Sequence, residues 1–171
     1  MILNHQKRIL GIDPGSRKTG FGIINSDGLT YQYVTGGCLH LSNNDSYAQL
    51  QQIFQGLSEI IEEYQPEEFA IEQVFVKINV NSALKLGQAR GVALVVAANR
   101  GLHIAEYSAR QVKQAVVGFG AASKEQVQHM VKLLLKLKQR PQEDMADALA
   151  VAMCHANTNR LIQKLKNIGV K

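Results

Sequence analysis

The stretch Arg8-Ile-Leu-Gly-Ile-Asp-Pro-Gly15 is a short apolar run that ends on a single carboxylate, Asp13. Its branched apolar residues suit a buried strand, and Pro14 and Gly15 suit the tight turn that follows. A second apolar run, 19–24, begins after three polar residues, so we expect the two runs to pair as a hairpin with Asp13 near its end. The alternative is an ordinary Asp that starts a turn before Pro-Gly.

Further patterns predict a sheet covered by helices. Runs of strand-forming residues predict strands over 29–35, 67–74 and 102–107. Helical spacing of apolar residues predicts helices from about 46 to 64, from about 81 to 100 and from 124 to 137, with a last helix that starts at Pro141. Residues 43–46 offer several N-caps, and Ser46 with Gln49, like Ser123 with Gln126, has the spacing of a capping box.

Composition limits the class of protein. A chain of 171 residues with 46% hydrophobic content fits one domain with a sizeable core. Cys38 and Cys154 lack metal-ligand spacing and form no disulfide framework, which fits a reducing cytosol. We find no signal peptide and no apolar run of membrane-spanning length, and therefore expect a cytoplasmic protein without a membrane partner.

The net charge of +5 is unevenly distributed. Residues 1–104 carry 8 basic and 9 acidic side chains, whereas residues 105–171 carry 11 and 5, so the second part alone is +6. Such an asymmetry suggests a polyanionic partner such as nucleic acid, and the alternative is a solvated basic surface without one.

Three more acids stand in apolar surroundings. Strand alternation places Glu72 on the opposite face from Phe69 and Ile71, although an exposed edge strand could also accept it. The helix macrodipole explains Glu143 and could explain Asp144 in the first turn of the last helix. It does not explain Asp147, which alanines surround and which shares a helix face with Asp144.

These four acids, Asp13, Glu72, Asp144 and Asp147, favour a metal centre. Two carboxylates ~4 Å apart repel by about 4 kcal/mol at an effective dielectric constant near 20, so a cluster needs protons or cations. Carboxylate ligands suit Mg²⁺ or Mn²⁺, and the chain has no His or Cys grouping that suits Zn²⁺. Two such ions roughly 3.5 to 4 Å apart can hydrolyse a phosphodiester. An acidic metal centre beside a basic surface is what a nuclease requires.

Four motifs carry a resemblance to a known family: Gly11-Ile-Asp-Pro-Gly-Ser-Arg-Lys-Thr-Gly20, Ile71-Glu-Gln-Val-Phe75, Ala109-Arg-Gln-Val-Lys-Gln114 and Asp144-Met-Ala-Asp-Ala-Leu-Ala150. Together they resemble, in order from about Arg8 to His155, the RuvC family of Holliday junction resolvases. The resemblance implies an α/β, ribonuclease H-like fold with a five-stranded mixed sheet, its first three strands antiparallel, and helices on both faces. We expect one such domain over residues 1–157 and a basic C-terminal tail over 158–171.

The resemblance also implies an activity. Members are homodimeric, Mg²⁺-dependent endonucleases, with two ions per site and Mn²⁺ as a substitute, that nick two strands symmetrically across a four-way DNA junction. The four acids match the family's metal-binding acids. Phe75 matches an aromatic residue thought to stack on an unpaired junction base, and Lys113 and Lys124 match basic residues facing the DNA backbone. Branch-migration proteins of the RuvA and RuvB type would be partners.

Three other functions compete with this one. An actin-like or sugar-kinase-like ATPase lobe also has a strand followed by Asp and a glycine-rich hairpin, but it needs a second lobe that 171 residues do not provide. A noncatalytic binding module on the same fold would lose acids, and all four are present. A ribonuclease H-like nuclease that trims ribosomal RNA precursors would share the first motif but not the context of Glu72.

The helix expected from Asn81 to Arg100 is apolar nearly all round, which predicts burial on more than one side. We expect it to form the interface of a two-fold dimer, because most soluble homo-oligomers are of this kind. Gly87 and Gly91 would allow close approach of two backbones, or packing on the protein's own sheet. One stripe at helical spacing comprises Val80, Ala83, Leu84, Gly87, Gly91, Leu94, Val95 and Ala98, and further apolar surface comes from Val92, Ala93, Val96 and Ala97.

Overall fold

The structure is a computed structural model that describes residues 6–42, 45–74 and 80–167. Its strands are β1 (Lys7–Asp13), β2 (Lys18–Ser26), β3 (Tyr31–His40), β4 (Glu68–Glu72) and β5 (His103–Tyr107). Its helices are α1 (Ser46–Tyr64), α2 (Val80–Asn99), α3 (Ala109–Val117), α4 (Lys124–Leu134) and α5 (Glu143–Asn167). The strands form one sheet in the order β3-β2-β1-β4-β5. The first three are antiparallel, and β4 and β5 continue the sheet parallel to β1, which confirms the expected mixed sheet.

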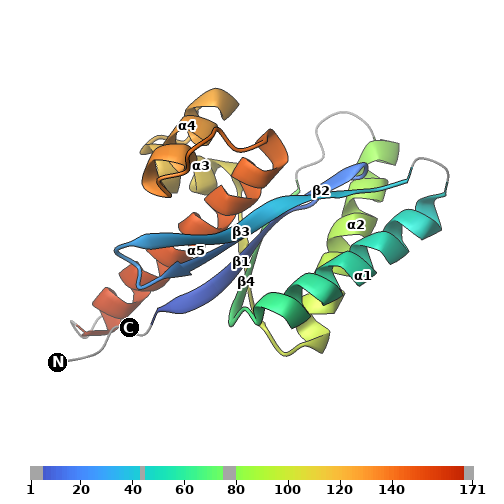
Figure 1. Cartoon of the computed structure of the whole chain (residues 1–171), viewed down its shortest axis with the longest axis horizontal. Coiled ribbons are helices and arrows are strands. Elements are labelled where there is room, and N and C mark those ends of the chain that lie inside the picture. The colour runs from blue at the N-terminus through green and yellow to red at the C-terminus, as the bar shows by residue number, and fades with distance from the viewer. Residues whose placement is uncertain (1–5, 43–44, 75–79, 168–171) are drawn as a thin grey trace.

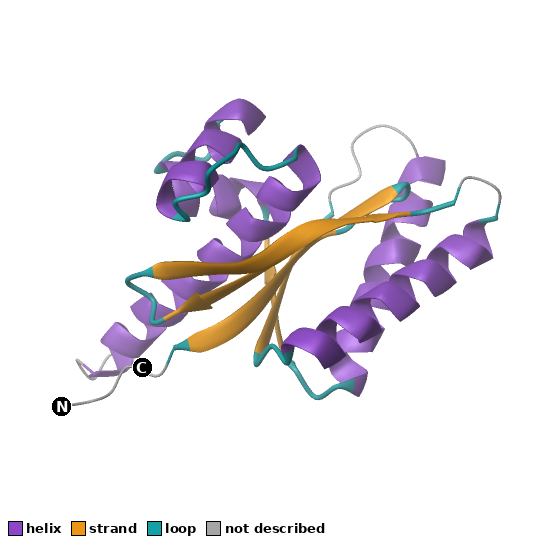
Figure 2. Ribbon diagram, viewed as in Figure 1, coloured by secondary structure: helices purple, strands orange, loops and turns teal. Residues whose placement is uncertain are grey.

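Helices cover both faces of this sheet, as expected. Figure 1 shows α1 and α2 side by side on one face, and α5 running along the other with α3 and α4 packed near its N-terminal half. Figure 2 shows the same layers, with the twisted strands between two groups of helices. None of the helices described is long and apolar enough to span a membrane.

Alternation along β1 divides the core in two. Leu10 and Ile12 point toward α1 and α2, where they are buried with Phe69 and Ile71 of β4. Ile9 points to the other face and is buried with the residues of α3, α4 and α5. The expected separation of Phe69 and Ile71 from Ala70 is confirmed, because Ala70 belongs to the α5 side.

Glycines allow α5 to lie directly on the strands. A Cβ atom added at Gly11 would lie 2.1 Å from the backbone oxygen of Ala148. One added at Gly20 would lie 2.1 Å from the backbone oxygen of Asp144. Real Cβ atoms never come so close to a backbone oxygen, so only glycine fits at these two positions. The acidic end of α5 is thereby held against the ends of β1 and β2.

Several expected boundaries were wrong in detail. The strand predicted over 29–35 is β3, which begins at Tyr31 and continues to His40, while Leu29 is 58% exposed in the turn after Asp27. That turn forms because the Asp27 carboxylate accepts hydrogen bonds from the next backbone N–H groups. The predicted 124–137 helix ends at Leu134, where the chain turns through a left-handed Lys136 (φ 53°).

One helix start agrees with expectation and one differs. Asp45, one of the N-caps expected over 43–46, caps α1, because its side chain accepts the Tyr47 backbone N–H, whereas Ser46 with Gln49 does not provide the cap. The last helix begins at Glu143 rather than at Pro141, since the carbonyl of Gln142 accepts its first intrahelical bond, from Ala146. This helix continues through Asn167, so most of the segment expected to be a basic tail is helical.

Candidate active site

A pocket of about 230 Å³ lies at the carboxyl ends of β1 and β4. Its walls carry three of the four predicted acids, Asp13, Glu72 and Asp147, together with both predicted lysines, Lys113 and Lys124. Apart from these charged groups, its lining comes from the small or apolar residues Ala109, Val112 and Val127. The structure therefore brings together five residues that are as many as 134 positions apart in the sequence.

The sheet and α5 explain why the three acids meet. β1 and β4 are adjacent and parallel, with Ile12 opposite Ile71, so the acids that end these strands, Asp13 and Glu72, lie at one edge of the sheet. Alternation directs both side chains to the α5 face, like Ile9 and Ala70. Asp147 comes from the first turns of α5, which the contacts at Gly11 and Gly20 hold on the strands.

Asp144 lies beside the pocket rather than in its lining. One helical turn before Asp147, it is close enough to Asp13 to raise the pKa of that carboxyl. Its Oδ2 atom accepts a weak hydrogen bond from the Cys38 thiol of β3, with 3.8 Å between sulfur and oxygen. The predicted fourth acid is thus at the same end of the sheet, next to the other three.

Burial and mutual repulsion make these acids unusually basic. Burial, and then the charges of Glu72, Asp147 and Asp144, raise the pKa of Asp13 to about 8 against the opposing charge of Lys124. Burial and the charge of Asp147 also raise the pKa of Glu72, and burial raises that of Asp147. Each additional cation at this site would stabilise the ionised forms, so the cluster has the electrostatics of a cation site.

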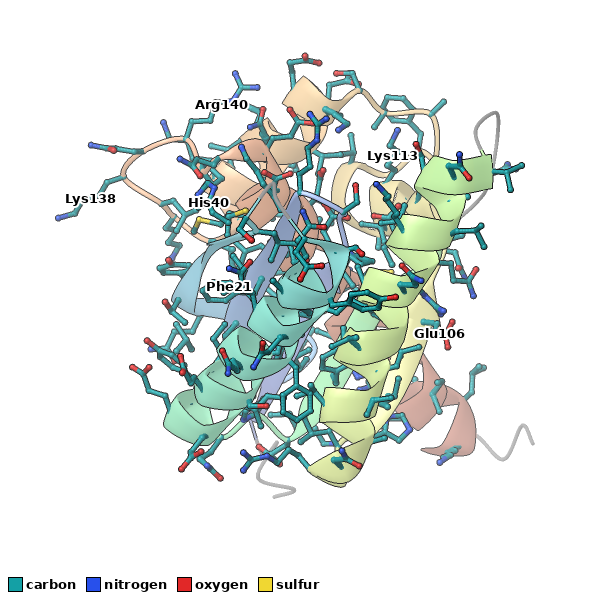
Figure 3. All side chains as sticks on the ribbon, turned by 90° about the vertical axis from the view of Figure 1, so that its right-hand side faces the viewer. Phe21, His40, Glu106, Lys113, Lys138 and Arg140 are labelled. Carbon is teal, nitrogen blue, oxygen red and sulfur yellow. The ribbon has the colours of Figure 1, made fainter. Side chains whose placement is uncertain are left out.

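The two lysines reach the pocket from separate helices. Lys124 is the first residue of α4, whose start is fixed by the predicted capping box of Ser123 and Gln126. It pairs with Glu143 at the start of α5, and this hydrogen bond is the main cause of its raised pKa. Lys113 lies on α3, and in Figure 3 it appears at the same upper end of the molecule as Lys138 and Arg140. The acidic pocket is therefore bordered by one lysine from α3 and one from α4.

The donor set fits a hard divalent cation. Within the described parts of the chain, no three carboxylate, imidazole or thiol groups lie close enough to enclose a metal ion by themselves. The pocket instead presents carboxylates on separate elements, with room between them for water. Mg²⁺ is held in this way by a few carboxylates while it keeps several waters and binds substrate phosphates. The residues present thus fit Mg²⁺ by their chemistry.

Sequence reasoning overlooked a second polar cluster. Glu68 and His155 are 5% and 1% exposed and hydrogen-bonded to each other on the α5 side of the sheet. Burial alone would raise the pKa of Glu68, but hydrogen bonds from His155 and Lys7 outweigh it and lower the pKa to about 2. A signal was present, because strand alternation puts Glu68 on the same face as Glu72.

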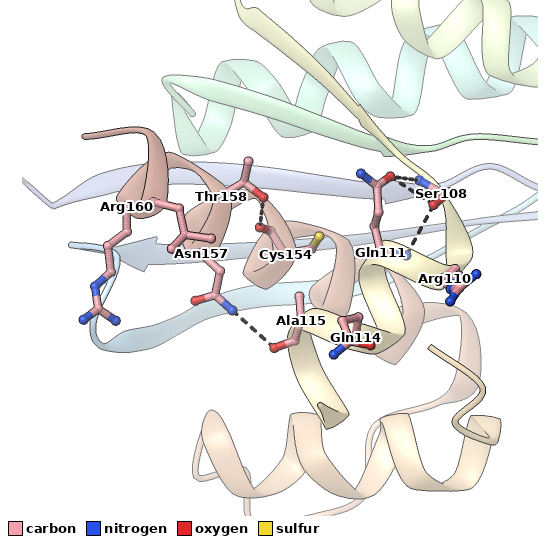
Figure 4. A pocket seen from close by; sticks show the side chains of 10 residues that line it. Ser108, Arg110, Gln111, Gln114, Ala115, Cys154, Asn157, Thr158 and Arg160 are labelled. Atoms are coloured by element: carbon pink, nitrogen blue, oxygen red, sulfur yellow. Dashed lines mark hydrogen bonds between the residues drawn. The ribbon is translucent and has the colours of Figure 1, made fainter. Parts of the chain in front are cut away.

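The predicted stacking residue, Phe75, lies outside the described residues. A second cavity, of about 560 Å³, lies between α3 and α5 (Figure 4). Residues lining it include Arg110, Cys154 and Arg160, whereas the predicted acids and lysines gather at the smaller pocket.

The far face of α2 is apolar and open. Ala89, Ala93, Val96 and Ala97 point inward and are buried against the sheet and α1. Val80, Leu84 and Val95 of the predicted stripe point outward, with Leu84 62% exposed, and a Cβ atom added at Gly87 or Gly91 would have no neighbour within 4 Å. We call this outward stripe, defined by Val80, Leu84, Gly87, Gly91 and Val95, the α2 stripe.

Comparison with known proteins identifies relatives over nearly the whole chain. Residues 9–155 match the family model described as crossover junction endodeoxyribonuclease RuvC. The crossover junction endodeoxyribonuclease RuvC of Marinobacter nauticus is 57% identical over 163 residues, covering 95% of this chain and 93% of that protein. That of Pseudoalteromonas atlantica is 58% identical over 157 residues, covering 92% of this chain and 91% of that protein.

Solved structures agree with these matches. T. thermophilus RuvC in complex with Holliday junction substrate superposes with a TM-score of 0.86 at 34% identity, covering 91% of this chain and 96% of that chain. The yeast mitochondrial Holliday junction resolvase has a TM-score of 0.70 at 10% identity, covering 95% of this chain and 84% of that chain, which shows a common fold.

Proposed function

The chain belongs to the RuvC family of crossover junction endodeoxyribonucleases, and on that premise we propose that it cuts four-way DNA junctions. The proposed reaction is a pair of symmetric nicks in strands of like polarity, made by phosphodiester hydrolysis during recombination and DNA repair in the cytoplasm. The observation that carries the proposal is the pocket itself, where Asp13, Glu72 and Asp147 face Lys113 and Lys124.

We propose that Asp13, Glu72, Asp144 and Asp147 hold two Mg²⁺ ions, for which Mn²⁺ substitutes. When bound, the ions supply an activated water and stabilise the leaving oxygen. The protein's own part is to hold the carboxylates together in the pocket, although burial and mutual repulsion favour their protonated forms. The raised pKa of Asp13 supports this assignment, because a carboxyl that repels its neighbours gains most from a cation.

The lysines act on the DNA in this proposal. Lys113 and Lys124 line the same pocket as the acids, so a phosphate that approaches the carboxylates meets both ammonium groups. Their charge stabilises the additional negative charge of the transition state, which accelerates the reaction more than it strengthens binding. Phe75 keeps its proposed role in stacking on an unpaired junction base.

We further propose a two-fold dimer that joins through the α2 stripe. Two like cuts on a two-fold junction need two active sites in one frame, and a self-complementary surface provides such symmetry. An exposed apolar surface with two glycines suits the close approach of two helices. Branch-migration proteins of the RuvA and RuvB type are the proposed partners of the dimer on DNA.

One experiment tests the activity. The protein is incubated with a mobile four-way junction and Mg²⁺, and with a linear duplex of the same sequence as the control. We expect paired nicks in the junction only, no cleavage without Mg²⁺, and at least about a hundredfold loss of rate in Glu72→Gln. Equal cleavage of the duplex, or full activity of Glu72→Gln, would refute the proposal, and preferential cleavage of structured RNA would indicate an RNA-processing nuclease instead.

A further inference from the structure

A fully paired polar chain is buried on the α5 side of the sheet. The Glu68 Oε2 atom lies 2.7 Å from His155 Nε2, and His155 Nδ1 lies 2.7 Å from the Tyr107 hydroxyl. Asn159 donates to the same carboxylate oxygen at 2.6 Å, and Lys7 pairs with the other one. Because an ionised carboxylate only accepts, Nε2 carries a proton, and in the neutral ring Nδ1 then accepts from Tyr107. The chain therefore fixes the position of the Tyr107 ring.

Tyr107 is the neighbour of a pocket acid. It ends β5 and stands opposite Glu72 in the parallel pairing of β4 with β5. Its ring is buried on the α5 face, the face to which alternation also directs the Glu72 side chain. The backbone carbonyl of Tyr107 accepts the N–H of Gln73, the residue after Glu72, at 2.8 Å. The backbone of Tyr107 thus holds the end of β4 that carries Glu72, and its ring lies on the same face of the sheet as the Glu72 side chain.

A pocket lysine depends on the same residue. Ser108 follows Tyr107 and is the N-cap of α3, with a complete capping box to Gln111 that Figure 4 draws as dashed lines. Lys113 lies on this helix and lines the pocket. A shift at the end of β5 would therefore be transmitted both to Glu72 and to Lys113.

We propose that Tyr107, held by His155 and Glu68, is a positioning residue that keeps Glu72 and Lys113 in their productive places; this inference rests on the function proposed above. Tyr107 is placed for this role by its register opposite Glu72 and by the bond from the Gln73 N–H to its carbonyl. The hydrogen bonds that join Glu68, His155 and Tyr107 hold this residue in place from outside the pocket.

The first test compares two tyrosines. Tyr107→Phe removes the hydroxyl that is hydrogen-bonded to His155. Tyr31→Phe removes a hydroxyl that is hydrogen-bonded to another residue of α5, Asn157, but Tyr31 lies at the start of β3. We expect Tyr107→Phe to lower the single-turnover rate on the junction about tenfold and to raise the Mg²⁺ concentration for half-maximal rate, with junction binding unchanged. Tyr31→Phe should leave both kinetic quantities within about twofold of the unmodified protein, whatever its effect on melting temperature.

A second readout needs no metal and no activity. In the metal-free protein, the Gln73 amide should exchange with deuterium about tenfold faster in Tyr107→Phe than in Tyr31→Phe, because its acceptor is the Tyr107 carbonyl. Unchanged exchange at Gln73, or a Tyr107→Phe rate equal to that of Tyr31→Phe, would overturn the inference.

A third variant tests the chain as a unit. Glu68→Gln keeps the shape of the side chain but removes the charge that holds His155, and should lower the rate in the same direction. The fold-loss of cleavage rate in the double variant with Tyr107→Phe should be smaller than the product of the two single fold-losses, because both substitutions act through the same series of hydrogen bonds. A fold-loss equal to that product would contradict the proposal. If Glu72→Gln is inactive and Tyr107→Phe is fully active, the positioning role of Tyr107 is wrong but the proposed function stands. If Glu72→Gln is active, the proposed function itself is wrong.

Discussion

Glycines of β1 and β2 lie directly under α5 on one face of the sheet, whereas large aliphatic and aromatic residues separate the sheet from α1 and α2 on the other face. On the α5 face, Gly11 and Gly20 let the helix backbone lie directly on the strands. On the opposite face, Leu10, Ile12 and Phe69 fill the space between sheet and helices. The same strands supply both sets of residues, because successive side chains alternate between faces.

In the function proposed above, this difference separates the chemistry from the assembly of the dimer. The α5 face holds the charged groups close to rigid backbone, where small shifts are resisted by contact with strands. The α1 and α2 face is an apolar layer whose outer surface, the α2 stripe, remains available for a second copy. Substitutions on one face should therefore change cleavage without changing the dimer, and substitutions on the other should do the reverse.

The largest effect is expected on the α5 face, at Asp147. Asp147→Asn removes a proposed metal ligand and leaves the basic surface intact, so the single-turnover rate at saturating Mg²⁺ should fall about a hundredfold or more while junction binding is retained. The matched control is Glu59→Gln, an exposed acid-to-amide change on α1. Retention of more than a few per cent of the rate would show that Asp147 is not a ligand.

The counterpart on the other face is Leu84→Glu in the α2 stripe. Two introduced charges would meet across a two-fold interface, so the dissociation constant of the dimer should rise about a hundredfold, which is roughly 2.7 kcal/mol. Leu133→Glu, an exposed leucine of α4, is the control. Sedimentation measures the mass: a folded Leu84→Glu monomer should nick single strands without paired resolution, and a Leu84→Glu dimer would exclude this interface.

A smaller effect on rate is expected at Lys124. Its charge faces the acids in the pocket, so Lys124→Ala should slow cleavage about tenfold at saturating junction, with a smaller change in affinity. Lys164→Ala, on the exposed C-terminal part of α5, is the comparison. If it contacts a phosphate at all, it should lower affinity and flatten the salt dependence by about one unit of slope, with the rate unchanged. If Lys124→Ala lowered only the affinity and Lys164→Ala lowered the rate, Lys164 rather than Lys124 would act on the transition state.

The smallest effect concerns pH. The pKa of Asp13 is about 8 in the folded protein and 3.8 as the ordinary value, so the folded state holds this proton more tightly. The stability it provides to the metal-free protein is complete below pH 3.8 and is lost as the pH rises toward 8. Between pH 6 and 7 the metal-free protein should lose about 1 kcal/mol relative to Asp13→Asn. Denaturant unfolding at pH 6 and pH 7 measures the free energy of unfolding of both proteins. If the unmodified protein and Asp13→Asn lose the same free energy between these pH values, a group other than Asp13 titrates.

Much of the fold could be predicted because local signals and tertiary structure agree. The alternation in β4 and the capping box of Ser123 with Gln126 depend on near neighbours, and the structure confirms them. Three acids in apolar surroundings, Asp13, Glu72 and Asp147, were a signal of the site, because such residues are costly unless they meet a partner.

What could not be predicted depends on distant contacts. The bond between Glu68 and His155 joins residues 87 positions apart, so strand alternation could place Glu68 on the Glu72 face but could not identify its partner. The inward face of α2 was also hidden, because a helix that is apolar nearly all round has no periodicity to reveal which side is buried. Only the structure shows that its alanines face inward and Leu84 outward.

The order of the acids along the chain has a consequence for biosynthesis. β1 and β4 leave the ribosome early with Asp13 and Glu72, whereas Asp147 emerges later on α5, and a domain generally folds as a unit. Until α5 docks on Gly11 and Gly20, one side of the central strand has no cover and the third pocket acid is absent. With the site as proposed, a growing chain therefore lacks a complete active site until α5 has packed on the sheet.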